Sequence, residues 1–157
     1  MNDPSGASWS RFAEQAPEFA QRVEARLTAN LHHVLATIRP SGAPRLNGSE
    51  VHVADGEVTL GMMTGSHKLA DVHRDARVEI HTAPLEDDLA NGDAKLWGRL
   101  ISTGAVVPDD ESGDGAAPEG TMFRLELSGV SLVRIEGDEL VLSTWTPDVG
   151  EREIRRR

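Results

Sequence analysis

The segment of this 157-residue chain with the clearest chemical potential is 61–68, which reads GMMTGSHK. Gly65 allows a tight turn, and the first turn of a helix after it would offer unpaired N–H groups at the positive end of the helix dipole. The Ser66 hydroxyl would add a donor, and the Lys68 ammonium would add a full charge next to His67. This pattern predicts a site for an anion, in particular a phosphate monoester.

The same residues also allow a purely structural interpretation. Ser66 can serve only as the amino-terminal cap of a helix, and Lys68 can be a solvated surface residue, because both features are common in helices. The setting of the segment favours the anion site. It follows a β-hairpin signalled by Asp55 and Gly56, and it precedes the sequence RDARV at 74–78.

Helical patterns occur at the amino terminus and in one later segment. Between Trp9 and Ala29 the apolar residues recur every three or four positions, which is typical of a helix. Pro17 is tolerated in the first turn of a helix but not in its interior, so it should split this stretch in two. We therefore expect a helical hairpin within residues 1–30 and one short helix over 66–74.

Short apolar or alternating runs separated by turn residues fill most of the remaining chain and predict six or seven strands. They lie at 34–38, 46–53, 58–62, 77–81, 95–107, 122–135 and 140–145. Such a chain can avoid exposed sheet edges by folding into an antiparallel barrel. The predicted fold class is mainly β, of the α+β type, with a small antiparallel β-barrel, an amino-terminal helical hairpin and one inserted helix. The length fits a single domain over residues 1–157.

Two polar segments, 84–93 and 108–120, should be surface loops. The second reads PDDESGDGAAPEG, and its acidic, turn-forming composition predicts a flexible loop. The last segment, 146–157, ends in several arginines and is expected to be a solvated carboxy-terminal tail.

Composition excludes several classes of function. The chain contains no cysteine, which rules out disulfides, thiolate metal sites and cysteine nucleophiles. Its 16 basic and 26 acidic residues give a net charge of −10, which argues against nucleic-acid binding. The six histidines show no metal-ligand spacing, so no metal site is expected. No run approaches the ~20 apolar residues of a membrane-spanning helix and no signal peptide is evident, so we expect a cytoplasmic protein without membrane association.

The order of these motifs resembles that of the pyridoxamine 5'-phosphate oxidase-like split β-barrels. The shared pattern comprises LATI, PSGAPR, a DG hairpin, TGSHK and RDARVEI, and it runs over residues 31–100. The triplet at 66–68 matches the family's Ser-Arg-Lys phosphate clamp, with histidine in place of arginine. Neutral histidine offers less charge, so either His67 is protonated beside the phosphate or another base, Arg39 or Arg45, compensates.

The resemblance implies a homodimer in which a flavin lies in a groove between two barrels. The flavin ring would contact the strand before the DG hairpin, here residues 47–52, where Gly48 would permit close approach of the backbone. Near the carboxy terminus, Trp145 and Arg155 resemble the tryptophan and arginine that reach the flavin in pyridoxamine phosphate oxidases. The cofactor site predicted in this way comprises Arg39, Gly48, Ser49, Glu50, Val51, Met62, Ser66, His67, Lys68 and Trp145.

In function, the resemblance implies a flavin- or deazaflavin-dependent oxidoreductase acting on an unknown small-molecule substrate. The cofactor would be FMN or, as the alternative, coenzyme F420, and haem is a less favoured third. The cofactor ring would perform hydride transfer, so no catalytic side chain is assigned. The alternative to an enzyme is a non-enzymatic flavin- or haem-binding dimeric barrel, which the histidine at position 67 favours. A third hypothesis is a structural protein that docks partners through its acidic loops.

Overall fold

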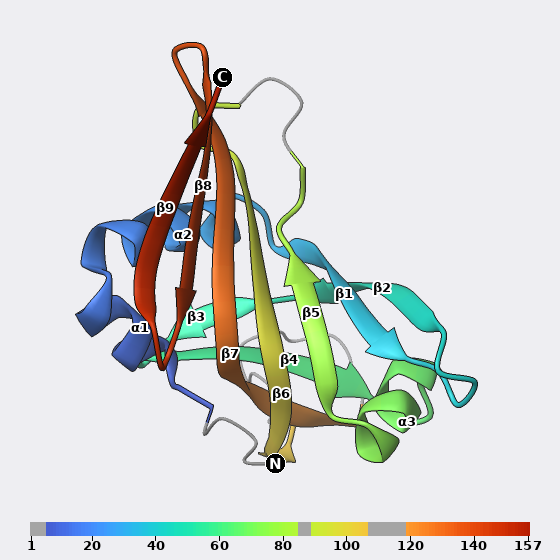
Figure 1. The fold of residues 1–157 in the computed structure, drawn as a ribbon. Coiled ribbons are helices and arrows are strands. Elements are labelled where there is room, and N and C mark those ends of the chain that lie inside the picture. The colour runs from blue at the N-terminus through green and yellow to red at the C-terminus, as the bar shows by residue number, and fades with distance from the viewer. Residues whose placement is uncertain (1–5, 85–88, 107–118) are drawn as a thin grey trace.

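The computed structural model describes residues 6–84, 89–106 and 119–157, which form three helices and nine strands (Figure 1). The helices are α1 (Trp9–Gln15), α2 (Pro17–Thr28) and α3 (His67–Arg74). The strands are β1 (His32–Ile38), β2 (Pro44–Glu50), β3 (His52–Ala54), β4 (Glu57–Met63), β5 (Arg77–His81), β6 (Asp93–Ala105), β7 (Gly120–Glu136), β8 (Glu139–Thr146) and β9 (Gly150–Arg156). The predicted mainly-β, α+β class is confirmed. In these described ranges no helix is long and apolar enough to cross a membrane.

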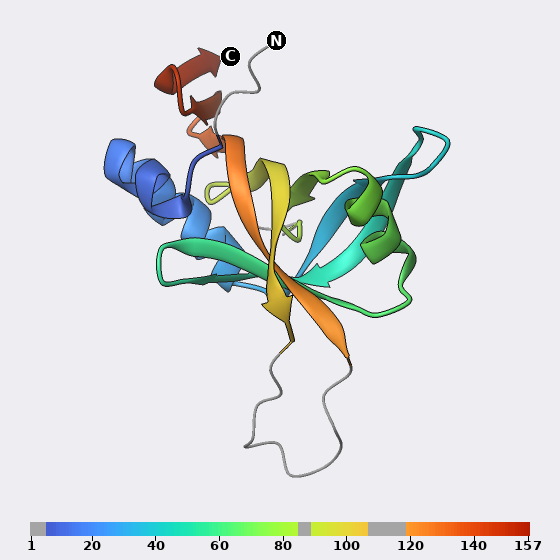
Figure 2. The same ribbon diagram turned by 90° about the horizontal axis from the view of Figure 1, so that it is seen from below.

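Local sequence signals set the boundaries of the amino-terminal helices. The Ser8 hydroxyl accepts the N–H of Arg11 at 3.2 Å and thereby caps α1. Pro17 is the first residue of α2, as predicted, because a first turn does not need its missing N–H. Phe12 of α1 and Phe19 of α2 pack edge to face, with ring centroids 5.2 Å apart. The helical hairpin lies on one side of the sheet (Figures 1 and 2).

The strands form one antiparallel sheet that curls over on itself. Its order is β2-β1-β5-β6-β7-β4-β3, and β8 and β9 extend it from β7. β2 and β3 are consecutive in the chain but form the two ends of this order. They are not paired with each other, so the barrel is open (Figure 2). Fully buried aliphatic side chains fill its interior, among them Leu35, Leu60, Ile80, Leu96 and Leu125.

β7 is the longest strand, with 17 residues, and it pairs with three others. One of its edges carries β6, and the other carries β4 and then β8. The register of β6 and β7 shifts between Trp97 and Gly98, where Ser128 of β7 is the extra residue of a bulge. A Cβ at Gly98 would collide with the carbonyl oxygen of Glu126, so the close approach of the two backbones requires glycine.

The predicted strand 46–53 is in fact two strands, β2 and β3. Val51 separates them, because its N–H donates to the carbonyl of Leu31 at 3.2 Å and not to a neighbouring strand. The Val51 side chain is buried, with 4% of its surface exposed. The chain therefore changes partner at this point: β2 pairs with β1, whereas β3 pairs with β4.

Segment 146–157, predicted as a solvated tail, is mostly exposed, but it is not an unstructured tail, because most of it forms β9 against β8. Arg134 of β7 contributes to its position. This side chain is buried, and its guanidinium lies 3.1 Å from the Glu153 carboxylate of β9. Arg155 of β9 in turn lies 3.2 Å from Glu139 of β8. Charged side chains contribute to holding this strand in place. Its sequence therefore lacks the apolar alternation by which a strand is usually predicted.

The two predicted loops fall partly outside the described residues, which omit 85–88 and 107–118. The flexible acidic loop predicted at 108–120 therefore stays a prediction for most of its length. β7 begins at Gly120, two residues earlier than predicted.

We predict that Arg134→Ala lowers the free energy of unfolding by about 1–3 kcal/mol, because it removes charge-assisted hydrogen bonds to Glu153 and Ser143. Arg156→Ala, at an exposed position of β9, is the matched control and should change the free energy of unfolding by less than about 0.5 kcal/mol. Urea unfolding followed by circular dichroism measures both variants. Equal effects of the two substitutions would show that Arg134 does not hold β9.

Candidate functional site

Two hollows adjoin on the surface where β2, β4 and α3 meet. The first, which we call the apolar hollow, has a volume of about 430 Å³. The second, the basic hollow, has a volume of about 500 Å³. Gly48 and Lys68 line both hollows, so these two residues mark the boundary between them.

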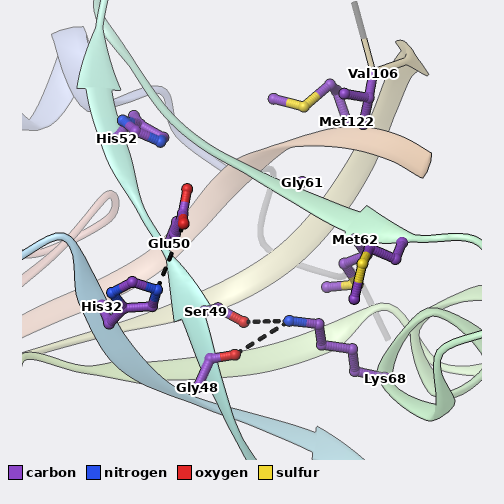
Figure 3. Close-up of a pocket in the computed structure, with 11 residues that line it drawn as sticks. His32, Gly48, Ser49, Glu50, His52, Gly61, Met62, Lys68, Val106 and Met122 are labelled. Carbon is purple, nitrogen blue, oxygen red and sulfur yellow. Dashed lines mark hydrogen bonds and ion pairs between the residues drawn. The ribbon is translucent and has the colours of Figure 1, made fainter. Parts of the chain in front are cut away.

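The apolar hollow has one polar and one apolar wall (Figure 3). Glu50 and His52 lie on the polar wall, and His32 of β1 approaches Glu50 to 3.4 Å. Thioether side chains, which adapt their shape to a neighbouring surface, dominate the other wall. They belong to Met62, Met63 and Met122. The hollow can therefore accept a flat apolar group with polar atoms along one edge.

Lys68 connects α3 to β2 between the two hollows. Its Nζ donates to the carbonyl oxygen of Gly48 at 3.1 Å and to the hydroxyl of Ser49 at 3.0 Å (Figure 3). Partial burial lowers the pKa of the ammonium, and the negative charge of Glu50 opposes this shift. An ammonium group has three N–H donors, so these two bonds leave one for a ligand.

The basic hollow gathers cationic and polar side chains from three elements. Arg39 follows β1, Arg45 belongs to β2, and Ser66 and His67 stand at the start of α3. Ser66 caps α3 by accepting the N–H of Leu69 at 3.3 Å, as predicted. The amino terminus of a helix carries partial positive charge, which adds to that of the arginines. This arrangement suits an anion.

A buried carboxylate contacts Arg45 from inside the protein. Asp71 of α3 is 1% exposed, and its Oδ2 lies 2.6 Å from Nε of Arg45. The same oxygen accepts the Thr37 hydroxyl at 2.9 Å, and Arg74 lies 3.4 Å from Oδ1. The hydrogen bond from Arg45 is the main cause of the lowered pKa of Asp71, and it outweighs the opposing effect of burial. Asp71 is therefore ionised at neutral pH.

The structure brings eight of the predicted site residues together along the two hollows. They are Arg39, Gly48, Ser49, Glu50, Met62, Ser66, His67 and Lys68. Val51 and Trp145 line neither hollow. Trp145 is fully buried, its ring lies 4.9 Å from that of Phe12, and its indole N–H donates to Gln15 at 3.1 Å. The structure thus places Trp145 in the core of the molecule, where the resemblance had assigned it to the cofactor.

Sequence reasoning missed His32 and Met122 as parts of the site. Both come from strands that lie far from segment 61–68 in the sequence. The register of β4 and β7 places Met122 opposite Gly61, and a Cβ at Gly61 would lie only 3.1 Å from the Met122 sulfur. No local pattern could reveal this pairing, because it depends on the alignment of two distant strands.

No family model and no curated protein matches the sequence. Solved structures do resemble it. A pyridoxamine 5'-phosphate oxidase-related, FMN binding protein from Nostoc punctiforme aligns with a TM-score of 0.62 and 12% identity, over 90% of this chain and 96% of its own. PhzG from Burkholderia lata, in complex with tetrahydrophenazine-1-carboxylic acid, aligns with a TM-score of 0.66 and 12% identity, over 99% and 94%. An F420 reductase aligns with a TM-score of 0.51 and 16% identity, over 64% and 89%.

These likenesses define the fold. The chain has the fold of the pyridoxamine 5'-phosphate oxidase-related proteins, and the resemblance inferred from the motifs is confirmed at that level. The likeness covers nearly the whole chain, whereas the motifs span residues 31–100 only. At identities of 12–16% the residues of the site must be judged by their own geometry.

We predict a pH-dependent contribution to stability from the end of α3, the helix that carries Lys68. Arg77 donates to Asp75 at 2.7 Å and lowers the pKa of that carboxyl from 3.8 to about 2. Because this pKa is depressed on folding, the contribution is present above about pH 4 and is lost as the pH falls through about 2. Arg77 is exposed, so solvent screening weakens the effect.

The variant Asp75→Asn should therefore be less stable than the parent at pH 5, and the difference should disappear below about pH 2. Urea midpoints measured across this range check the expectation. A stability difference that does not change with pH would contradict it.

Proposed function

We propose that the two hollows together bind a flavin-type cofactor, FMN or coenzyme F420, and that the protein is a flavin- or deazaflavin-dependent oxidoreductase. The observation that carries this proposal is the junction of a basic and an apolar hollow at Gly48 and Lys68. A ligand that fills both must join an anion to a flat apolar ring. FMN and coenzyme F420 both do so. The fold likeness to an FMN binding protein and to an F420 reductase supports the choice.

The basic hollow would hold the phosphate of the cofactor. The Ser66 oxygen caps α3, and its own hydrogen can still be donated to a ligand. Lys68 adds a charged N–H group, and the first turn of α3 adds backbone donors. Arg45 supplies a permanent positive charge, which serves where His67 stands in place of the arginine of the family motif. Charge-assisted hydrogen bonds of this kind are the strong contacts to phosphate.

The apolar hollow would hold the ring. A Cβ at Gly48 would meet no atom within 4 Å, so this strand presents bare backbone to the open space of the groove. The methionine wall would cover the ring and exclude water from it, while Glu50 and His52 would face its polar edge. When bound, the cofactor supplies hydride transfer to or from a small-molecule substrate. The protein orients the ring relative to that substrate.

Titration of the purified protein with FMN, and separately with coenzyme F420, tests the proposal through the change in cofactor fluorescence. We favour FMN of the two. Binding of neither cofactor at micromolar concentration would contradict the proposed function.

We predict that Gly48→Val weakens binding of the cofactor by about 10- to 100-fold, because its side chain fills space that both hollows share. Gly48→Ala should have a smaller effect in the same direction. Neither change should lower the stability of the cofactor-free protein, since glycine is unfavourable inside a strand. Calorimetric titration and thermal unfolding measure the two properties separately.

Ala54→Val is the matched control for this series, because Ala54 is exposed on β3 and lines neither hollow. It should leave binding unchanged. If Gly48→Val binds cofactor as tightly as Ala54→Val does, the cofactor does not occupy this groove.

A second subunit would cover the groove in the homodimer that we also propose. Leu46 at the basic hollow is 72% exposed, and Met63 at the apolar hollow is 56% exposed. Large apolar side chains exposed beside a ligand groove are typical of a surface that a partner covers. The cofactor would then lie between the two subunits.

Sedimentation equilibrium should accordingly give twice the chain mass of 17.0 kDa. Leu46→Glu should shift the equilibrium toward monomer, because it would bury an unpaired charge. Leu140→Glu, at a 41% exposed position of β8, is the control and should leave the dimer intact. A monomer that binds cofactor fully at all concentrations would rule out the homodimer.

A further inference from the structure

Arg45 is held at one edge of its guanidinium group by a residue that does not line the hollow. Its Nε lies 2.6 Å from Asp71, and its side chain is 18% exposed at the basic hollow. A guanidinium is planar and carries its five N–H donors in a fixed fork. An arginine held through Nε therefore has its terminal amino groups available for a second, bidentate contact with an anion.

Asp71 is an unusual residue for a purely structural position. A carboxylate that is 1% exposed loses its hydration, and only well-placed partners compensate for that loss. A buried ion pair can often be replaced by apolar residues without loss of stability. Packing alone therefore does not require a charge here, whereas fixing the orientation of Arg45 does.

The partners of Asp71 come from all three elements that surround the basic hollow. Thr37 of β1 donates to Asp71, and the Asn47 amide of β2 lies 3.3 Å from the Thr37 hydroxyl. Arg74 of α3 bonds both to Asp71 and to the carbonyl of Ile38 at the end of β1. The carboxylate thus has a fixed position relative to β1, β2 and α3. A group held in this way can orient a neighbouring arginine reproducibly.

We propose that Asp71 is a positioning residue of the anion site, and that it orients Arg45 so that the site distinguishes a phosphate monoester from the same ligand without its phosphate. This inference rests on the proposed function. FMN and riboflavin provide the comparison, because they share the ring and differ in the phosphate. A contact made by Arg45 to the phosphate affects FMN alone, whereas damage to the fold affects both ligands.

The experiment compares dissociation constants for FMN and riboflavin, measured by flavin fluorescence, in the parent and in variants. Asp71→Asn should weaken FMN binding by about tenfold or more and change riboflavin binding by less than about twofold. Arg45→Ala should do the same. The double variant should bind FMN no more weakly than Arg45→Ala alone, because Asp71 acts through Arg45.

Two further variants keep the test decisive if Asp71→Asn folds poorly. Arg45→Lys retains the charge beside Asp71 but loses the planar fork, so it should weaken FMN binding and spare riboflavin. Thr37→Val removes one hydrogen-bond donor to Asp71 and should also lower the preference for FMN over riboflavin. Asp75→Asn, which breaks an exposed pair at the other end of α3, is the matched control and should leave the preference unchanged.

Equal losses of FMN and riboflavin affinity in Asp71→Asn and Thr37→Val would overturn the inference, because they indicate a structural role only. Additive losses in the double variant would also overturn it. A parent protein that binds FMN and riboflavin equally overturns the inference together with the placement of the phosphate in the basic hollow, whereas binding of neither contradicts the proposed function itself. A parent that prefers FMN, with the same preference in every variant, contradicts this inference alone.

Discussion

The arrangement of the molecule depends on one strand, β7, which must pair with partners that diverge. Its residues 120–124 pair with β4 and its residues 130–136 pair with β8 along the same edge, while β6 runs along the other edge. Between these two pairings, Leu127 bonds with Ala7 of the amino-terminal segment. Because strands in a sheet twist, β4 and β8 leave β7 in different directions. The strand thereby belongs both to the barrel and to an extension that it forms with β8 and β9 (Figure 1).

This double role of β7 explains where the candidate site lies. β4, held by the first part of β7, forms one wall of the apolar hollow, and Met122 reaches that wall from β7 itself. β2 forms the facing wall, and Lys68 connects it to α3 through two hydrogen bonds. Trp145 belongs to β8 and therefore packs against α1 in the extension, away from the hollows. The site is thus a product of the barrel half alone within this chain.

Features encoded by neighbouring residues could be predicted from the sequence, and features that depend on distant pairing could not. The break at Pro17 and the cap at Ser66 act within one helical turn, and both are confirmed. β9 is rich in charged side chains and mostly exposed, so its pairing with β8 and its contact with Arg134 distinguish it from a tail. Met122 enters the site through its register with β4. The helix start at the basic hollow was predictable because its motif is continuous, whereas the contact of Asp71 with Arg45 links two elements.

That link changes how the histidine at position 67 should be understood. An arginine there would carry the charge at the exposed start of α3, where His67 now lies. Arg45 places a permanent charge in the same hollow from β2, and the interior carboxylate of Asp71 holds it in place. A strand residue held from the interior is more restricted than a long side chain at a helix start, so less conformational entropy is lost when an anion binds. Because a guanidinium stays charged at pH values where histidine is neutral, the proposed anion site does not depend on protonation of His67.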